Sequence, residues 1–171
     1  GDRIRIDLPD FQQEFIKKIH AIGKPTVLVM LNGSAVAINW ENENIPAILE
    51  AWYPGQAAGA AVANVLFGDY NPAGRLPVTY YKSVDQLPPF ENYNMEGRTY
   101  RYFNEEPLYS FGFGLSYTSF EYTNLKTPEV VSAKEALKVS VDVTNTGEMD
   151  GDEVVQLYLK DEKASTVRPI C

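Results

Sequence analysis

The sequence predicts an α/β protein in which a partial layer of helices and parallel strands is followed by an incomplete all-β sandwich. Two observations lead to this prediction. Residues 10–67 alternate between segments with helical spacing of apolar side chains and short continuous apolar runs, a pattern typical of helices packed on a parallel sheet. After residue 120, apolar and polar side chains alternate one by one, as in half-buried antiparallel strands.

The composition is that of a folded, acidic protein. Of 171 residues, 44% are hydrophobic and 12% aromatic, which is enough apolar surface for a core. The formal net charge of -8, with no basic stripe, argues against nucleic acid and against a membrane surface as partners. No apolar run reaches the ~20 residues of a membrane span. The single cysteine, Cys171, excludes an intrachain disulfide and a multi-cysteine metal site.

The first part of the chain is expected to form a helix and then a strand. Residues 10–22 repeat apolar side chains with helical spacing, and Gly23 ends the repeat. The apolar stripe of this helix consists of Phe11, Phe15, Ile19 and Ile22. Residues 26–31 are continuous and β-branched, so we expect a strand buried on both faces, as in a parallel sheet.

A second strand and a second helix continue this layer. Residues 46–52 form a short apolar element, and residues 55–67 an Ala-rich helix that Gly68 ends. Gly55 and Gly59 open this helix, where free N–H groups could hold a phosphate. Because neither Gly-x-Gly-x-x-Gly nor a P-loop lysine is present, we favour the close packing of this helix on a sheet.

The remainder of the chain has two segments that differ in composition and in the pattern of apolar residues. Residues 68–119 are rich in proline, tyrosine and phenylalanine, which predicts a long ordered connection because so many aromatic rings would not be left in water. Residues 137–144 alternate as a half-buried strand, the turn 145–148 follows, and residues 155–159 repeat the alternation. This alternating pattern is typical of an immunoglobulin or fibronectin type III sandwich.

Both predicted layers are incomplete. A sandwich of this kind needs about seven strands in about 100 residues, whereas only about three fit after residue 120. An α/β layer with two strands cannot close its sheet either. We therefore expect a chain that is truncated at both ends.

Two catalytic arrangements can be tested on the sequence. A serine hydrolase would use Ser34, but the local sequence is not Gly-x-Ser-x-Gly and the only histidine, His20, precedes it. His20 is more simply a residue near the end of the first helix. Glycoside hydrolysis needs two carboxylates, and nothing local marks any candidate as buried or paired. The candidates are Glu41, Glu43, Glu50, Asp69, Glu91, Glu96, Glu105 and Glu106.

The stretch from residue 93 to residue 103 mixes aromatic rings with arginines. Flat apolar faces and forked donors suit a sugar ring, which stacks its C–H face and hydrogen-bonds through its hydroxyls. The simpler alternative is a plug between domains, in which Arg98 or Arg101 pairs with Glu105 or Glu106. The residues concerned are Tyr93, Met95, Glu96, Arg98, Tyr100, Arg101, Tyr102 and Phe103.

Five strings of sequence closely resemble glycoside hydrolase family 3, the β-glucosidase and β-xylosidase family. The first two match its second domain, and the resemblance covers nearly the whole chain. They are AILEAWYPGQ at 47–56, VLFGDYNPAGRLPVT at 65–79, GRTYRYF at 97–103, PLYSFGFGLSY at 107–117 and DGDEVVQLY at 150–158.

The resemblance implies an enzyme of three parts: an N-terminal TIM-like barrel, an α/β sandwich domain and a fibronectin type III-like domain. Residues 1–115 resemble the C-terminal part of the sandwich domain, with an aromatic interdomain connection at 80–115, and residues 116–171 resemble the truncated start of the fibronectin-like domain. The family uses a retaining mechanism with an Asp nucleophile on the barrel and a Glu acid/base just upstream of the segment that begins at Gly1. The catalytic residues are therefore expected outside this chain.

The resemblance also implies a function, and the aromatic stretch described above supplies the substrate-binding candidates. We expect part of an exo-acting β-glycosidase that releases terminal glucose or xylose, inactive alone because both carboxylates are missing. The alternative is a non-catalytic carbohydrate-binding or interaction module on the same scaffold. The substrate would be an oligosaccharide or an aryl β-glycoside, and the location secreted or periplasmic, with no cofactor and no metal. The substrate-binding candidates are Glu96, Arg98 and Tyr100, and the candidates for supporting the acid/base loop are Asp2 and Arg3, for which a solvated pair is the simpler account.

Overall fold

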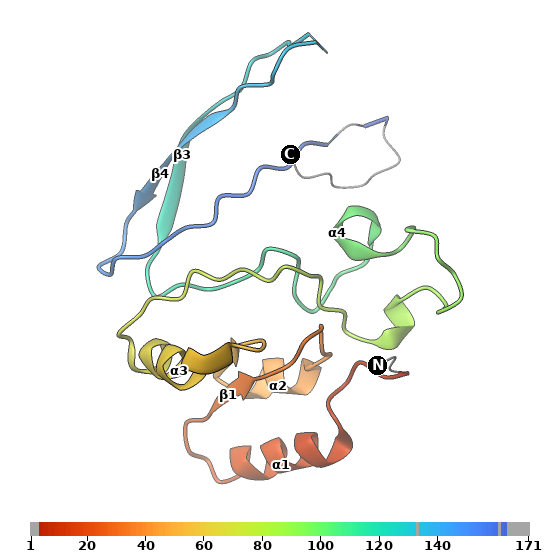
Figure 1. The fold of residues 1–171 in the computed structure, drawn as a ribbon, viewed down its shortest axis with the longest axis vertical. Coiled ribbons are helices and arrows are strands. Elements are labelled where there is room, and N and C mark those ends of the chain that lie inside the picture. Colours follow the sequence, from red (N-terminus) through yellow and green to blue (C-terminus); the bar gives the residue numbers. More distant parts are fainter. Residues whose placement is uncertain (1–3, 133, 161, 164–171) are drawn as a thin grey trace. The chain divides into compact units, whose positions relative to one another are not determined.

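The computed structural model describes residues 4–132, 134–160 and 162–163 (Figure 1). The chain divides into two compact units. The first unit comprises Gly1–Ala63, Arg75–Phe113 and Gln156–Cys171, and the second comprises Asn64–Gly74 and Gly114–Val155. The mixture of helices with small sheets agrees with the predicted α/β class.

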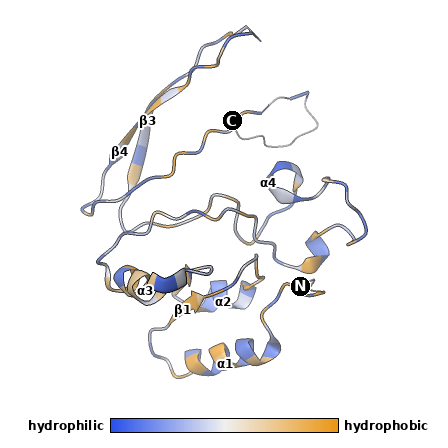
Figure 2. Ribbon diagram, in the orientation of Figure 1, coloured by the Kyte–Doolittle hydropathy of each residue, from blue (hydrophilic) through white to orange (hydrophobic). Residues whose placement is uncertain are grey.

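The first unit begins with helix α1, Asp10–His20, which confirms the predicted helix. Gly23 ends it with a φ of 75°, a conformation that glycine adopts without strain. The predicted apolar stripe is only partly covered, because Phe11 and Phe15 are exposed while Ile16 packs on the core. Figure 2 shows hydrophobic and hydrophilic patches along α1. A layer of two strands is too narrow to cover the whole stripe.

The sheet of the first unit has two parallel strands, as the sequence predicts. Strand β1, Val27–Met30, pairs with β2, Ala47–Glu50, in a register that sets Met30 opposite Glu50. Helix α2, Asn39–Asn44, lies between them in the chain. The prediction that the first strand is buried on both faces is wrong: Val27 is 48% exposed and only Met30 is buried. In a two-stranded sheet both strands are edge strands, so neither is covered on all sides.

Helix α3, Ala58–Phe67, follows the short 3-10 helix η1, Gly55–Ala57, and ends at Gly68 as predicted.

The core of the first unit forms around the β1–β2 sheet. The buried cluster consists of Leu8, Met30, Val36 and Ile38, with Ile16, Leu28, Ile48, Leu108 and Tyr109 packed against it. The longest helix in the described part is α1, with 11 residues, and none of the helices there could cross a lipid bilayer.

The aromatic segment of the first unit is ordered by backbone pairing. Residues 76–80 and 108–113 run antiparallel: the Leu76 and Tyr80 amides donate to the carbonyls of Phe113 and Tyr109 at 2.8 and 2.9 Å. Between these stretches the chain forms the 3-10 helix η2, Val84–Gln86, and the one-turn helix α4, Thr99–Tyr102. The expected order is thus present, while a role as interdomain connection stays a prediction.

The second unit is built on an antiparallel strand pair. Strand β3, Phe120–Lys126, pairs with β4, Ser140–Asn145, with an irregularity between Thr123 and Lys126. The alternation predicted for residues 137–144 therefore produces a strand. The fibronectin-like sandwich stays a prediction, since one pair of strands does not define it.

The second alternating segment, residues 155–159, does not form the strand that its pattern predicts. Within the described residues 151–160 only Tyr158 takes part in a β-bridge. The Gln156 amide group instead donates to the Gly112 carbonyl at 3.2 Å. Gly112 has a φ of 79° and leaves no room for a Cβ beside this amide. Alternation alone cannot produce a strand where a side chain, rather than a neighbouring strand, makes the contact.

Candidate functional site

The first candidate site is a polar network at the carboxyl end of the parallel strands. Asn32 lies two residues after β1, Glu50 is the last residue of β2, and Tyr80 comes from the aromatic segment. The Tyr80 hydroxyl donates to Glu50 Oε2 at 2.7 Å, and Asn32 Nδ2 donates to the same oxygen at 3.1 Å. In open α/β sheets this edge is where ligands bind.

The network holds the two loops that leave the strands. Glu50 Oε1 accepts a hydrogen bond from the backbone N–H of Trp52 at 3.0 Å, and Asn32 Nδ2 also donates to the Ser34 carbonyl at 2.9 Å. Trp52 has a φ of 52°, which is strained for a residue with a side chain. A carboxylate that receives three donors is well suited to stabilising such a turn.

Tyr80 is enclosed at the centre of this network. The residue is 2% exposed, so burial raises the pKa of its hydroxyl, and the bond to the Glu50 carboxylate raises that pKa further. Asn32 Nδ2, 3.4 Å from the hydroxyl, has a smaller opposite effect on this pKa. The hydroxyl therefore acts as a hydrogen-bond donor that keeps its proton.

The raised pKa of Tyr80 predicts a loss of stability in alkali. Above about pH 10 an exposed tyrosine in the unfolded chain ionises while Tyr80 stays protonated in the folded chain. The unfolded state then binds fewer protons, so the free energy of unfolding falls by up to about 1.4 kcal/mol per pH unit for this group. Urea unfolding of the wild type and Tyr80→Phe from about pH 9 to about pH 11 measures it. Equal slopes in the two proteins would contradict the prediction.

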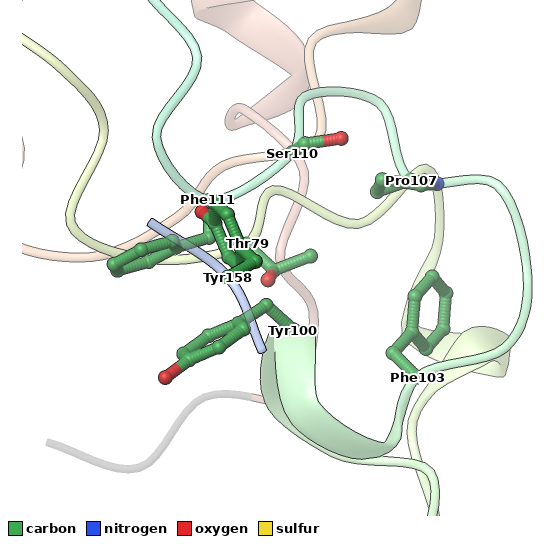
Figure 3. Close-up of a pocket in the computed structure, with 7 residues that line it drawn as sticks. All are labelled: Thr79, Tyr100, Phe103, Pro107, Ser110, Phe111 and Tyr158. Carbon is green, nitrogen blue, oxygen red and sulfur yellow. The ribbon is translucent and has the colours of Figure 1, made fainter. Parts of the chain in front are cut away.

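The second candidate site is a pocket of about 230 Å³ in the first unit (Figure 3). Three of its residues come from the paired stretches 76–80 and 108–113, and two from α4 and the residue that follows it. Figure 3 shows Thr79 near the centre, between the rings of Tyr100 and Phe103. The pocket is lined by Thr79, Tyr100, Phe103, Pro107, Ser110, Phe111 and Tyr158.

Aromatic contacts fix the walls of this pocket. Tyr100 stacks on Phe111 with ring centres 4.4 Å apart and meets Tyr158 edge-on at 6.4 Å. The Tyr100 hydroxyl accepts a hydrogen bond from Arg101 Nε at 2.9 Å. Phe103 is buried and lies edge-on to Tyr81 at 5.0 Å. Because each ring is held by a neighbour, the apolar surfaces stand in place before any ligand arrives.

The predicted substrate-binding residues have different environments. Tyr100 lines the pocket, whereas Glu96 is exposed to solvent. The Arg98 guanidinium donates to the carbonyls of Asn92 and Asn94 at 2.6 and 3.2 Å, so it closes its own loop. Asp2 and Arg3 lie outside the described residues.

The predicted pairing of Arg98 or Arg101 with Glu105 or Glu106 is wrong for the described part of the chain. Glu105 accepts from Gln86 Nε2 at 3.0 Å, and Glu106 pairs with Lys82 Nζ at 3.0 Å. Both arginines bind partners that are nearer in sequence. Closing a shorter loop loses less conformational entropy than a contact with Glu105 or Glu106 would.

Sequence reasoning missed several residues of these sites. Thr79 and Tyr80 carried no local signal, since they stand in a proline-rich stretch far from the residues they meet. Asn32 could have been found, because polar residues at the ends of adjacent parallel strands share one edge, and Glu50 was a candidate carboxylate without a sign that it is paired. Glu41 is fully enclosed, and within the described ranges neither of its carboxylate oxygens has a hydrogen-bond partner.

Comparison with known proteins identifies the family. Residues 1–117 match the glycosyl hydrolase family 3 C-terminal domain. The chain belongs to glycosyl hydrolase family 3. Over 160 residues it is 51% identical to a xylan 1,4-beta-xylosidase of Xylanibacter ruminicola, covering 94% of this chain and 18% of that protein. It is 41% identical to the periplasmic beta-glucosidase of Salmonella typhimurium, covering 99% of this chain and 24% of that protein.

A solved structure extends the similarity to the fold. The β-glucosidase of Erythrobacter marinus superposes with a TM-score of 0.84 at 44% identity, over 99% of this chain and 23% of that one. The family 3 chain thus spans about a fifth to a quarter of the length of these relatives. The resemblance stated from sequence strings is confirmed.

Proposed function

We propose that these 171 residues are part of an exo-acting, retaining β-glycosidase that removes terminal non-reducing β-D-glucosyl or β-D-xylosyl residues. The observation that carries the proposal is the 51% identity, across 94% of the chain, to a protein named xylan 1,4-beta-xylosidase. The similarity to a named β-glucosidase supports glucose as the other candidate sugar. The substrate would be an oligosaccharide or an aryl β-glycoside.

The two catalytic carboxylates would lie outside these residues. A retaining glycosidase needs a nucleophile and an acid/base about 5–5.5 Å apart. We place the Asp nucleophile on a barrel domain and the Glu acid/base upstream of Gly1, which agrees with the small share of each relative that the chain covers. Glu50 is a poor substitute, because both of its oxygens already accept hydrogen bonds from its own unit.

The parts of the chain would then have distinct roles. Residues 1–115 would complete the α/β sandwich domain, with the connection at 80–115, and residues 116–171 would begin a fibronectin-like domain; the β3–β4 pair supports an all-β beginning. The substrate-binding candidates stay Glu96, Arg98 and Tyr100. Asp2 and Arg3 would support the acid/base loop.

The proposed location is outside the cytoplasm, secreted or periplasmic. It is supported by the name of the Salmonella typhimurium relative, a periplasmic beta-glucosidase. Enzymes that act on polymer-derived sugars meet their substrates there.

Two polypeptides test the proposal: the 171-residue chain and the longer native polypeptide that an antibody against residues 85–106 detects. Each is assayed with p-nitrophenyl β-D-glucopyranoside and p-nitrophenyl β-D-xylopyranoside. We expect hydrolysis by the longer polypeptide with retained anomeric configuration, and none by the short chain. A folded longer polypeptide that is inactive on both substrates would refute the activity. Hydrolysis by the short chain would show that the carboxylates were misplaced.

A further inference from the structure

We infer that the pocket around Thr79 is a non-catalytic binding site for a single neutral pyranose ring. It does not depend on the hydrolysis proposed above, because no carboxylate is among the described residues that line it. Three features support it: the size of the pocket, the chemistry of its walls and a buried hydroxyl that has no partner among the described residues.

The size of the pocket limits the ligand to one ring. Its volume of about 230 Å³ lies below the range of about 300–1,000 Å³ that is usual for drug-sized ligands. An oligosaccharide would therefore place one unit inside and the rest in solvent. A single water molecule, at about 30 Å³, would leave most of the walls without contacts.

The walls favour a neutral ring with an apolar face. Tyr100, Phe103 and Phe111 present aromatic rings, whose faces are negative and attract the weakly positive C–H hydrogens of a pyranose. None of the described residues that line the pocket is charged, so a phosphate, carboxylate or ammonium group would lose its water without gaining a partner among them. Rings already held by stacking lose little freedom when a ligand binds.

A buried hydroxyl distinguishes a sugar from a purely apolar ring. Thr79 is 7% exposed, and within the described part of the chain its Oγ1 has no hydrogen-bond partner. The Thr79 side chain points into the space between the Tyr100 and Phe103 rings (Figure 3). Staggered rotation about χ1 exchanges Oγ1 with the methyl group, which lets the hydroxyl meet a ligand there. An unpaired buried hydroxyl is costly, and a sugar hydroxyl would remove that cost.

The second polar group lies nearer to solvent. Ser110 is exposed, and Figure 3 shows its hydroxyl on the far side of the pocket from Tyr100. A ring that stacks on Tyr100 would thus have neutral hydroxyl partners at two different positions. A pyranose, with hydroxyls on successive carbons, is able to satisfy both.

An NMR titration of the 171-residue chain tests the inference, because one neutral ring with few hydrogen bonds is expected to bind weakly. The probes are methyl β-D-xylopyranoside, methyl β-D-glucopyranoside and, as an aromatic ring of similar size, phenol. We expect saturable amide shifts at Thr79, Tyr100, Ser110, Phe111 and Tyr158 with at least one glycoside. Shifts with phenol alone, or with no probe, would overturn the inference.

The decisive variant is Thr79→Val, which keeps the shape of the side chain and removes only the hydroxyl. Because that hydroxyl has no partner among the described residues, the variant should fold with an unchanged or higher melting temperature. We expect roughly tenfold weaker glycoside binding, the effect of losing one hydrogen bond of about 1.4 kcal/mol. Thr26→Val, which removes a threonine hydroxyl bonded to the Lys24 carbonyl outside the pocket, is the control and should bind like wild type. Equal affinity of Thr79→Val and wild type would refute the site.

Failure of this inference is distinct from failure of the proposed function. Binding is measured on the short chain and hydrolysis on the longer polypeptide. An active longer polypeptide with no saturable binding by the short chain refutes only the pocket, and the reverse result refutes only the hydrolysis.

Discussion

Replacing Tyr80 by alanine is expected to lower the free energy of unfolding by about 3–5 kcal/mol, the range for removing a buried aromatic ring. The ring lies edge-on to Trp52 at 6.3 Å and to Tyr109 at 5.9 Å, so its removal leaves a cavity between two aromatic neighbours. Glu50 Oε2 also loses its shortest hydrogen bond. Urea unfolding followed by tryptophan fluorescence measures the loss, because Trp52 belongs to the affected region.

Two milder variants separate the contribution of the ring to stability from that of the hydroxyl. Tyr80→Phe keeps the ring and removes the donor to Glu50, and we expect a loss of about 1–3 kcal/mol. Glu50→Gln keeps the length of the side chain but can place an N–H group against the donor Asn32 Nδ2, so a loss of similar size is expected. If Tyr80→Ala costs no more than Tyr80→Phe, the ring contributes little and the cavity argument is wrong.

The contrast between Glu50 and Tyr80 shows how far the sequence could predict this site. Apolar runs predicted both strands and their parallel pairing, which places Asn32 and Glu50 at one edge of the sheet. Tyr80 reaches Glu50 from 30 residues further along the chain, and such a contact depends on tertiary packing that no local pattern encodes. Tyr100 was selected from its aromatic setting, whereas Thr79 became evident only from its burial and its unpaired oxygen.

Two sequence patterns gave wrong predictions because the strand or the burial that they predict needs a neighbouring segment. The alternating residues 155–159 have the period of a strand but make a side-chain contact at Gly112 instead. The helical stripe of α1 has the right period, yet Phe11 and Phe15 are exposed because the two-stranded sheet is narrow. Periodicity thus indicates the local conformation, while burial depends on which other segments are present to cover the side chains.

Replacing Asn71 by alanine is expected to have the largest effect in the second unit, a loss of about 2–4 kcal/mol, because one buried side chain loses three hydrogen bonds. Asn71 is buried, and its Oδ1 accepts hydrogen bonds from the Tyr117 amide at 2.8 Å and from Ser116 Oγ at 2.9 Å. Its Nδ2 donates to the Asp150 carbonyl at 3.1 Å. One side chain thus ties the segments that precede β3 and follow β4. Hydrogen exchange of the β3 and β4 amides measures the effect.

Asn145 provides a matched control, because it also makes three hydrogen bonds but is exposed. Its Oδ1 accepts from Thr118 Oγ1 at 2.7 Å and from the Gly147 amide at 3.0 Å, and its Nδ2 donates to the Met149 carbonyl at 2.9 Å. Water can replace each of these partners in Asn145→Ala, so we expect a loss of only about 0.5–1 kcal/mol. If both variants lose the same free energy of unfolding, the number of hydrogen bonds determines the loss and burial does not. A loss several times larger for Asn71→Ala would show that the burial of the side chain, and not the number of its hydrogen bonds, determines the cost.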